Sequence, residues 1–473
     1  MQNKTKIIAT IGPASCSKQK LNALITAGVN VCRINFSHGS HDDYAKIIKI
    51  IREINENLNL HTAILTDLQG PKLRIGQVKD NKIKLVKGNH ITLTTKKCVG
   101  TAEKIYITYM QFPEDIIVGA KILVDDGKII LKALKTNKKD EVKAEIIQGG
   151  ILSSNKGINL PNTRISLPCL TEKDLSDLKF ALENDVEWIG LSFVRSASDI
   201  VKLKELIAGQ GKKTKVIAKI EKPQAVRDID NIIKEADGLM VARGDLGVEV
   251  PMQDVPLIQK EIVKKCQQAA KPVIIATQMM ESMVKNMTPT RAEVNDVANA
   301  VMDGADAVML SSETSVGKYP VEAIRTMYKI VEKAETFEEI YNKDHLPGID
   351  HKRIITDWIC YNACKLAQRV SAKAIITMSF TGYTGFKVSS HRPKANIFVF
   401  TANRSILNTL SMIWGVRGIY YNKFESTDNT ITDIKRILKK QGLISENDLV
   451  INITSMPIAE KGESNMLKLS YVK

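Results

Sequence analysis

The chain has 473 residues, of which 44% are hydrophobic and 25% charged, and this is the composition of a globular protein with two or three domains. Such a balance excludes a disordered or fibrous chain. No apolar segment approaches membrane-spanning length, and the first residues lack an apolar stretch of signal-peptide length, so we expect a cytoplasmic protein without a membrane partner.

Charge and cysteine content narrow the partners further. A net charge of +16 fits either a nucleic-acid partner or anionic metabolites. The lysines are spread among isoleucines and asparagines instead of forming a stripe, so we expect no nucleic-acid partner and keep nucleic-acid binding only as the non-enzyme alternative. Seven cysteines without a C-x-x-C pair predict reduced thiols, and neither a disulfide framework nor a zinc site is expected.

The first part of the chain alternates strands and helices. Short β-branched runs predict strands at 5–12, 29–36 and 61–68, and apolar residues at helical spacing predict helices at 18–28 and 43–58. The next segment, residues 71–167, has no long helical pattern. It contains alternating runs at 90–96, 115–134 and 142–150, separated by Gly, Asn and Asp, which predict an inserted β domain in the form of a small β-barrel.

The alternation resumes after this insertion. Strands are predicted at 186–193, 215–221, 238–243, 272–278 and 306–312, and helices at 171–185, 197–210, 226–236, 255–270, 291–304 and 320–335. Thr171 with Asp174 is typical of a helix start, and Gly28 and Gly304 lie where helices end. Eight strands, each followed by a helix, predict a (β/α)8 TIM barrel built from residues 1–70 and 168–340.

A third pattern begins near residue 341. Strands at 373–379, 396–401, 417–421 and 449–454 alternate with helices and predict a C-terminal α/β domain at 341–473. The chain is therefore expected to form a barrel, a β domain inserted after the third barrel strand, and a doubly wound domain at its end.

In a TIM barrel the chemistry lies at the carboxyl ends of the strands. Arg33, Asn35 and Ser37 alternate along the second strand and its end, so they share one face. Lys219 and Glu221 share a face of the fifth strand in the same way. Buried charges persist only when they are paired or bound to an ion, so these two strands predict a polar site inside the barrel mouth.

The next two strands add to this site. Asp245 follows the sixth strand, and Gly244 beside it allows a backbone N–H to approach a ligand closely. Thr277 lies near the tip of the seventh strand. Glu221 and Asp245, on adjacent strands, predict a site for Mg²⁺, which takes few protein ligands and completes its shell with substrate oxygens and water.

The cations of the site suit phosphate chemistry. Arg33 matches a phosphate through its planar fork, and Lys219 is a point charge suited to an oxygen that becomes negative, which together indicate metal-assisted chemistry on a small phosphorylated acid. The alternatives are a barrel-lining ion pair for Lys219 and Glu221 and a helix N-cap for Asp245. Neither a Walker A motif nor a G-x-G-x-x-G helix start is present, so a P-loop ATPase and a dinucleotide enzyme are not supported.

Long motifs then resemble the pyruvate kinase family. They are, in order, "TKIIATIGPAS", "RINFSHGSHDDY", "GPKLRIG", "NKGINLP", "LPCLTEKD", "AKIEKPQAV", "MVARGDLGVEVP", "ATQMMESM" and "PTRAEVNDVANAVMDGADAVMLSSETSVGKYP". The resemblance implies a three-domain homotetramer that transfers phosphate between phosphoenolpyruvate and ADP, giving pyruvate and ATP with Mg²⁺ or Mn²⁺. It would place the chain at the last step of glycolysis.

The resemblance also implies residue roles. Arg33 would hold the transferring phosphate, and Lys219 would stabilise the transition state and the enolate. Glu221 and Asp245 would bind Mg²⁺, Gly244 with Asp245 would offer backbone donors to the substrate carboxylate, and Thr277 would act near the enolate methylene.

The same resemblance assigns a nucleotide site and suggests an effector site. Asn35, His38, Arg74 and Lys156 would contact nucleotide phosphates, and the β domain would close as a lid that excludes water. The segment 379–385 resembles a loop that binds an effector phosphate in many relatives, through Ser379, Thr381, Gly382 and Thr384. The terminal "TSMPIAEKGESNM" lacks the glycine-rich run of relatives regulated by fructose 1,6-bisphosphate, so a mono-phosphate effector or none is expected, with a plain solvated turn as the alternative.

One stretch departs from the family pattern. Many relatives require K⁺ beside Mg²⁺ and carry Thr, Lys, Glu and Thr where this chain has Leu68, Gln69, Lys72 and Ile75. In those relatives, the positions of Asn35, Ser37, Asp67 and Leu68 supply oxygens to the ion. We expect the Lys72 ammonium to act as an internal cation near Asp67, so that K⁺ is not required; the alternative is a lysine that points to solvent from the hinge.

Two competing functions remain at this point. Another phosphoenolpyruvate-handling barrel, a lyase or mutase, would share the enolate chemistry but would not need Arg74 and Lys156. A basic nucleic-acid-binding protein would show salt-sensitive retention on DNA and no turnover.

Overall fold

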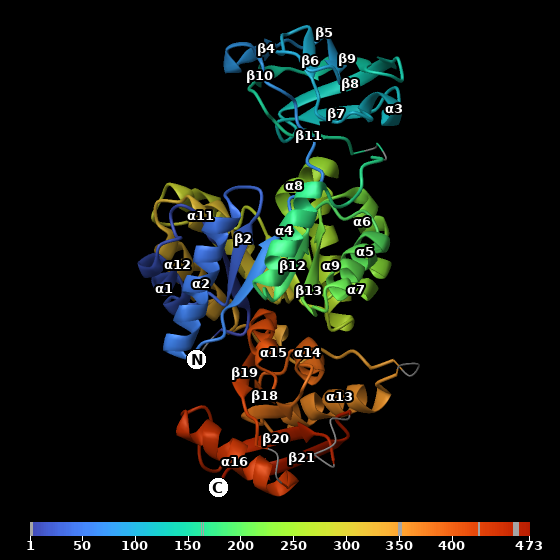
Figure 1. The fold of residues 1–473 in the computed structure, drawn as a ribbon. Helices are drawn as coiled ribbons and strands as arrows, with labels where there is room; N and C mark the ends of the chain where they lie inside the picture. The colour runs from blue at the N-terminus through green and yellow to red at the C-terminus, as the bar shows by residue number, and fades with distance from the viewer. Residues whose placement is uncertain (1–2, 162, 164, 349–351, 424–425, 457–462) are drawn as a thin grey trace.

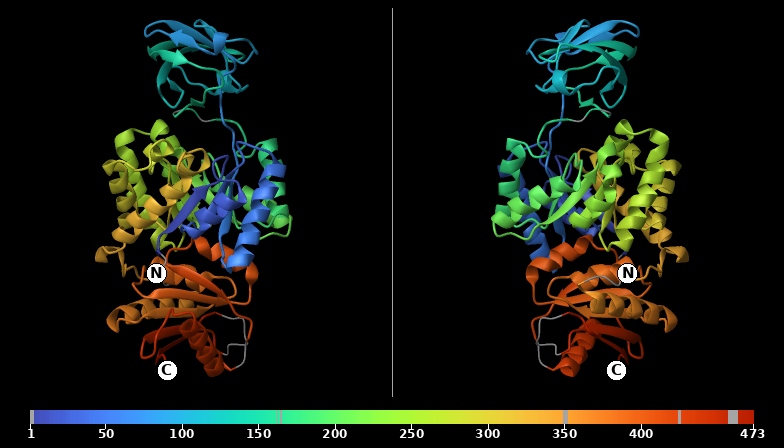
Figure 2. Two further views of the ribbon diagram at one scale, coloured as in Figure 1. Left: turned by 90° about the vertical axis from the view of Figure 1, so that its left-hand side faces the viewer. Right: turned by 90° about the vertical axis from the view of Figure 1, so that its right-hand side faces the viewer.

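The computed structural model describes residues 3–161, 163, 165–348, 352–423, 426–456 and 463–473. Figure 1 shows three parts stacked along one direction, with the inserted β part at the top, a barrel in the middle and the C-terminal part at the bottom. The turned views in Figure 2 show the same stack, in which thin connecting segments join the β part to the barrel. No helix within the described residues is both long and apolar enough to span a bilayer.

The predicted TIM barrel is confirmed. Its eight parallel strands close in the order β1-β16-β15-β14-β13-β12-β3-β2. They are β1 (Lys6–Thr10), β2 (Val31–Asn35), β3 (Ala63–Asp67), β12 (Trp188–Leu191), β13 (Lys215–Ile220), β14 (Gly238–Ala242), β15 (Val273–Ala276) and β16 (Ala307–Leu310). Each lies within a predicted strand, because each is a short apolar run that a parallel sheet can bury on both faces.

Alternation along these strands divides the apolar core. Ile7 and Ala9 face outward and pack against the helices, whereas Ile8 belongs to the cluster that fills the barrel interior. That interior cluster continues into the C-terminal domain, where Ile375 and Val399 belong to it. The lower end of the barrel is therefore closed by shared packing, and the open end lies beneath the inserted β part (Figure 1).

The helices surround the barrel. They are α1 (Lys18–Thr26), α2 (His41–Leu58), α4 (Glu172–Glu183), α5 (Ala197–Gly209), α6 (Pro223–Arg227), α7 (Ile229–Glu235), α8 (Arg243–Glu249), α9 (Val255–Gln268), α10 (Arg291–Asp303), α11 (Ser312–Ser315) and α12 (Pro320–Ala334). Thr171 and Asp174 form the expected capping box, and Gly304 ends α10 in the left-handed region with φ 101°. The helix predicted at 226–236 is two helices, because the chain turns at Asp228.

Asp245 is not a helix N-cap, so that alternative is wrong. Helix α8 begins at Arg243, directly after β14, and Asp245 lies in its first turn without capping it. The carboxylate is thereby left available at the barrel mouth.

The insertion is built mainly from strands, as predicted, but its described strands form two separate sheets and not the closed small β-barrel that was expected. Its strands are β4 (Ile83–Leu85), β5 (His90–Thr94), β6 (Lys104–Tyr106), β7 (Lys121–Val124), β8 (Ile129–Thr136), β9 (Glu141–Gln148), β10 (Gly150–Leu152) and β11 (Ile158–Asn159), with one short helix, α3 (Phe112–Asp115). They form a six-stranded sheet in the order β11-β7-β8-β9-β5-β6 and a two-stranded sheet of β10 and β4. The part has its own apolar core, which includes Leu93, Ile105 and Leu131.

The C-terminal part is the predicted α/β domain. Its sheet runs β19-β18-β17-β20-β21, with β17 (Ala374–Met378), β18 (Asn396–Thr401), β19 (Val416–Tyr420), β20 (Leu449–Thr454) and β21 (Met466–Tyr471). Its helices are α13 (Ile354–Arg369), α14 (Tyr383–Ser390), α15 (Arg404–Thr409) and α16 (Thr427–Lys440). The edge strand β21 pairs antiparallel with β20 and was not predicted, because half-exposed and charged residues interrupt its apolar pattern.

Candidate active site

The charged side chains predicted on different barrel strands meet at the open end of the barrel. Arg33 on β2 donates from Nε and Nη2 to Oδ2 of Asp67, over 2.9 and 2.8 Å, and from Nη1 to Oγ1 of Thr10 over 3.0 Å. Asp67 ends β3 and is 1% exposed. Burial raises the pKa of Asp67, but the charges of Arg33 and Lys219 outweigh it, so the pKa lies below its ordinary value and the carboxylate is ionised.

Lys219 lies at the centre of this cluster. Its Nζ is 2.9 Å from Oε1 of Glu221 and 3.3 Å from Oδ2 of Asp67, and it donates to Oγ of Ser192 over 2.7 Å. Burial lowers the pKa of Lys219, but the two carboxylates outweigh burial and raise the pKa above its ordinary value. The ammonium therefore stays charged in a buried site, where a positive charge acts strongly on a neighbouring anion.

Glu221 and Asp245 provide the carboxylates that a divalent cation needs. Glu221 is 1% exposed, and its Oε2 accepts the backbone N–H of Phe193 over 2.7 Å. Burial raises the pKa of Glu221 more than Lys219 lowers it, and the negative charge of Asp245 adds a further rise. A buried carboxylate whose pKa is raised by a neighbouring carboxylate fits a hard cation such as Mg²⁺, which would remove this repulsion. No cluster of three or more His, Cys, Asp or Glu suited to a metal occurs in the described residues. Mg²⁺ takes few protein ligands and completes its shell with oxygens from substrate and water.

Thr277 has an unusual backbone conformation at the end of β15. Its φ of 70° lies in the left-handed region, which is costly for a β-branched residue. Its Oγ1 accepts the N–H of Gly244 over 2.7 Å and donates to the carbonyl of Ala276 over 2.6 Å. Its own carbonyl accepts Nη2 of Arg243 over 2.8 Å, and Arg243 is held by two 2.7 Å contacts to Asp296 on α10. The Thr277 hydroxyl is thus fixed at the barrel mouth.

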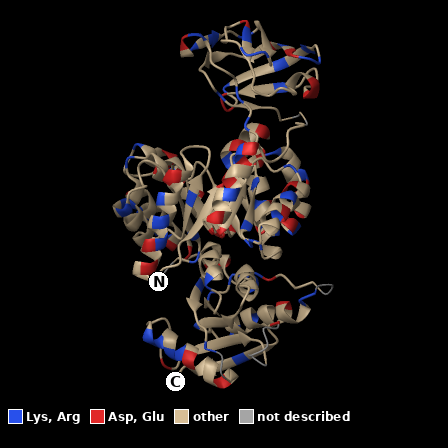
Figure 3. Ribbon diagram, viewed as in Figure 1, with Lys and Arg blue, Asp and Glu red and all other residues tan. Residues whose placement is uncertain are grey.

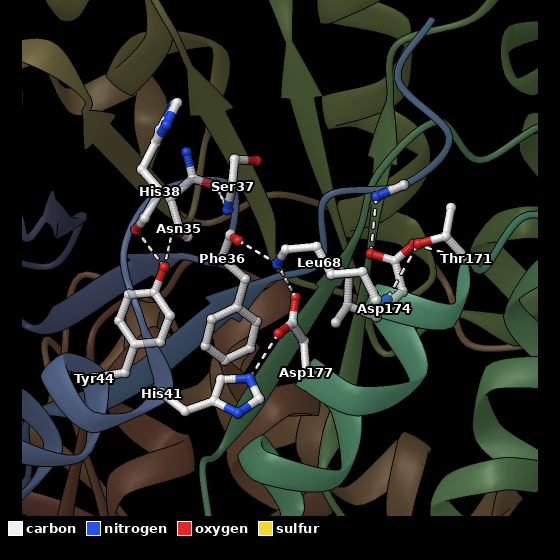
Figure 4. Close-up of polar contacts among 12 residues, drawn as sticks. Asn35, Phe36, Ser37, His38, His41, Tyr44, Leu68, Thr171, Asp174 and Asp177 are labelled. Carbon is white, nitrogen blue, oxygen red and sulfur yellow. Dashed lines mark hydrogen bonds and ion pairs between the residues drawn. The ribbon is translucent and has the colours of Figure 1, made fainter. Parts of the chain in front are cut away.

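Figure 4 shows the turn that follows β2. The hydroxyl of Tyr44 donates to the carbonyls of His38 and Asn35, and Oδ1 of Asn35 accepts the N–H of Ser37 over 3.1 Å. These bonds hold Asn35 and Ser37 at the edge of the mouth, and His38 is exposed beyond them. Leu68 lies across from this turn in the same view and is 1% exposed.

The other predicted cation near the barrel is Lys72, which lies on the hinge, the segment that connects β3 to the β part. Lys72 is exposed and lines a cavity of about 40 Å³ with Asn159 and Asp245. Among the ion pairs of the described residues none joins Lys72 to Asp67, whose cationic partners are Arg33 and Lys219.

The two predicted nucleotide cations are bound within the β part itself. Arg74 donates from Nη1 to the carbonyl of Asn155 over 3.0 Å, and Nζ of Lys156 is 2.8 Å from Oδ1 of Asp125. In the described part of the chain, no ion pair joins either side chain to a carboxylate of the barrel.

The predicted effector loop forms the start of α14. Oγ of Ser379 accepts the N–H of Gly382 over 3.0 Å, and Gly382 has φ 81° at the helix N-cap. Thr381 accepts the N–H of Tyr383 over 3.4 Å, and Oγ1 of Thr384 is 3.1 Å from Oγ of Ser464. Residues 457–462 of the terminal segment lie outside the described residues.

Sequence reasoning missed several polar residues of the site. Ser192 and Phe193 follow β12, a strand for which no functional residue was predicted, and they contact Lys219 and Glu221. Arg243 and Asp296 were also missed. The available signals were a serine that closes an apolar strand and an arginine directly before the Gly-Asp pair, but partners on other elements are not visible in sequence.

Known proteins resemble this chain along most of its length. A family model described as the barrel domain of pyruvate kinase matches residues 2–324, and one described as the alpha/beta domain of pyruvate kinase matches residues 357–470. The chain is 41% identical to the pyruvate kinase of Geobacillus stearothermophilus, over 100% of this chain and 81% of that protein. It is 40% identical to the pyruvate kinase of Corynebacterium efficiens, over 99% of this chain and 97% of that protein. The crystal structure of a pyruvate kinase from Cryptosporidium parvum superposes with a TM-score of 0.92 at 33% identity, covering 100% of this chain and 97% of that chain.

Proposed function

This chain belongs to the pyruvate kinase family, whose reaction moves the phosphoryl group of phosphoenolpyruvate to ADP and yields pyruvate and ATP, and we propose that the charged cluster at the open end of its barrel carries out that reaction. The observation that carries the proposal is the buried Lys219 ammonium, 2.9 Å from Glu221 and 3.3 Å from Asp67. Phosphoryl transfer needs little covalent help from the protein, so positioned charges of this kind are the main requirement.

Arg33 and Lys219 divide the substrate charges between them. Hydrogen bonds to Asp67 and Thr10 fix the orientation of the planar Arg33 guanidinium. We place this cation beside the transferring phosphate. Lys219 faces the oxygen that becomes the enolate, and because its pKa lies above the ordinary value it remains an ammonium throughout turnover. Its positive charge opposes the negative charge that develops as the phosphoryl group leaves.

Glu221 and Asp245 would hold Mg²⁺, with Mn²⁺ as a substitute. A divalent cation bound there would neutralise oxygens of the substrate and of the transferring group. Asp245 would offer its backbone N–H to the substrate carboxylate in the first turn of α8, and Gly244 would do so by exchanging its bond to Oγ1 of Thr277 for the substrate. Thr277 stands beside the methylene carbon that receives a proton when the enolate becomes pyruvate, and its hydroxyl acts through an intervening water.

The nucleotide would bind between the barrel and the β part. Asn35 and His38 border the mouth from the β2 turn, and Arg74 and Lys156 approach from the β part once it closes. Lys156 would then exchange its ion pair with Asp125 for a nucleotide phosphate. Closure would exclude water that would otherwise hydrolyse the phosphoryl donor. Distances between the two parts that do not change on addition of Mg²⁺ and substrates, measured by fluorescence or scattering, would rule this lid out.

The residues Leu68 and Lys72, which differ from those of K⁺-requiring relatives, support the proposal that the enzyme does not need K⁺. Asn35, Ser37, Asp67 and Leu68 would form the monovalent-cation site of K⁺-requiring relatives, and here the Leu68 carbonyl already accepts the hydroxyl of Ser192 over 2.7 Å. Lys72 lies on the hinge beside the barrel mouth. Closure of the β part would move its ammonium toward Asp67. Saturable activation by K⁺ at constant ionic strength would contradict this proposal.

Regulation and assembly are proposed from resemblance. The loop of Ser379, Thr381, Gly382 and Thr384 would bind the phosphate of a mono-phosphate effector, supported by its hydroxyl groups and the positive φ of Gly382 at a helix start. The protein would act as a homotetramer in the cytoplasm.

A single coupled assay tests the proposed function. Pyruvate formation should require phosphoenolpyruvate, ADP and a divalent cation together. Turnover of phosphoenolpyruvate that does not depend on ADP would favour another barrel enzyme, a lyase or mutase. No turnover with salt-sensitive DNA retention would favour a nucleic-acid-binding protein. Figure 3 argues against that last outcome, because Lys and Arg lie in all three parts and are interleaved with Asp and Glu.

A further inference from the structure

We propose that Ser192 and Phe193, the two residues that follow β12, form a positioning corner that orients Lys219 and Glu221 for phosphoryl transfer. The inference rests on the proposed roles of those two side chains. β12 lies between β3 and β13 in the barrel, and unlike those two strands it contributes no charged group to the site. The proposal gives the end of β12 a function.

Ser192 connects Lys219 to the hinge. Its hydroxyl accepts from Nζ of Lys219 over 2.7 Å and donates to the carbonyl of Leu68 over 2.7 Å. Leu68 in turn donates its N–H to the carbonyl of Gly190 over 2.9 Å. Both the N–H and the carbonyl of Leu68 are therefore bonded to the chain at the end of β12. Since Ser192 is 3% exposed, water does not compete for either bond.

The Ser192 hydroxyl fixes the direction in which the Lys219 ammonium points, which the two carboxylates around Lys219 do not. Glu221 and Asp67 attract the ammonium at 2.9 and 3.3 Å. A carboxylate attracts an ammonium from many directions, so these two contacts alone do not fix how the Nζ group is turned. A neutral acceptor fixed to a backbone carbonyl adds direction without adding charge, and so selects one orientation of the Nζ group.

Phe193 does the same for Glu221. Its φ of 55° places it in the left-handed region, and its N–H then reaches Oε2 of Glu221 over 2.7 Å. This conformation is strained for a bulky residue, so the surrounding fold must hold it in place. Gly70 leaves room for Phe193 and Ser192, because a Cβ there would lie 2.9 Å from the Phe193 ring and 3.2 Å from the Ser192 carbonyl.

The consequence is that one peptide segment sets both catalytic side chains. The oxygen of Glu221 that accepts from Phe193 differs from the one that faces Lys219, which leaves each contact independent. Loss of the Ser192 hydroxyl should therefore disorient Lys219 while Glu221 stays in position. The expected defect lies in the chemical step more than in substrate binding.

The test compares kcat and KM for phosphoenolpyruvate in Ser192→Ala, Ser192→Thr and Ser389→Ala. Ser389 is the matched control, since it is a buried serine on α14 of the C-terminal part that donates to the Trp414 carbonyl over 2.7 Å and accepts from Arg392 over 3.3 Å. Removing a partner that orients a functional group lowers activity by about 10- to 100-fold. We expect this loss in kcat for Ser192→Ala, with KM changed less than about threefold, and restoration to at least half by Ser192→Thr.

Several results would overturn the inference. These are a kcat within about twofold of the wild type in Ser192→Ala, an equal loss in Ser389→Ala, or no restoration by threonine. If Ser192→Ala does not fold, the same comparison is made between Ser192→Cys, whose thiol is a weak donor and acceptor, and Ser192→Thr. Wild-type protein without turnover would instead refute the proposed function, and Lys219→Met with undiminished kcat would refute the role of Lys219.

Discussion

Gly190→Ala should inactivate the enzyme although Gly190 carries no functional group. Gly190 lies on β12 opposite Asp67 on β3, and a Cβ added there would be 2.3 Å from Oδ1 of Asp67. An ordinary contact begins at 3.4 Å, so one of the two groups must move by 1.1 Å. The main-chain strands are fixed by the barrel ladder, and the side chain of Asp67 will therefore move.

The magnitude follows from what Asp67 holds. It accepts two hydrogen bonds from Arg33 and faces Lys219 at 3.3 Å, so its displacement misplaces both cations. A misplacement of about 1 Å lowers the rate about 100-fold, equivalent to about 2.7 kcal/mol of activation free energy. Overpacking of a buried site also lowers the free energy of unfolding by about 1 to 3 kcal/mol.

The assay is steady-state pyruvate formation together with thermal unfolding. Gly209→Ala is the matched control, because a Cβ at this exposed position at the end of α5 meets nothing within 4 Å. It should keep full activity and gain about 0.4 to 1 kcal/mol of stability. If Gly190→Ala keeps kcat/KM within about threefold of the wild type, the reasoning that fixes Arg33 and Lys219 through Asp67 is refuted.

Three further predictions address charge, packing and metal. Burial lowers the pKa of His391 to about 3 and that of His345 to about 4, so the unfolded chain takes up these protons first and stability falls as the pH drops below 6.5. His391→Phe, which keeps a ring against His345, should reduce this loss by about 1.4 kcal/mol per pH unit between pH 6.5 and 5, and an unchanged slope of unfolding free energy against pH would contradict it. Arg392→Met should lower the unfolding free energy by about 3 to 5 kcal/mol, because Arg392 is 2% exposed and pairs with Asp306 across the interface between the barrel and the C-terminal part; denaturation showing less than about 1 kcal/mol of loss would refute that. Chelation of divalent metal should abolish turnover and leave circular dichroism unchanged, with recovery on addition of Mg²⁺ or Mn²⁺; turnover that survives chelation would exclude the proposed role of Glu221 and Asp245.

The barrel was predictable because its strands are buried on both faces. A run such as residues 238–242 is apolar throughout, and the helix that follows each strand has a clear amphipathic pattern. The missed strands lack this signal. Strand β11 spans only Ile158–Asn159, and β21 lies at an edge, where exposed polar residues alternate with packed ones.

Within a single strand, the alternation of side chains was enough to predict which site residues share a face. Lys219 and Glu221 share a face because they are two residues apart, and the structure brings them together. Contacts between strands follow from register, which one sequence does not reveal. The proximity of Ser192 to Lys219, and of Gly190 to Asp67, therefore could not be predicted. The position of Lys72 relative to Asp67 depends further on how the β part sits over the barrel.

The most direct test of the central claim is the turnover of Lys219→Met beside that of the wild type, with phosphoenolpyruvate, ADP and Mg²⁺ at saturation. Wild-type protein should form pyruvate and ATP in equal amounts. The variant should fold, because methionine fills the same volume, but its kcat should fall by about 1,000-fold or more since the charge that opposes the developing enolate is gone. A folded Lys219→Met protein that turns over within about tenfold of the wild type would contradict the claim that the buried ammonium carries the reaction.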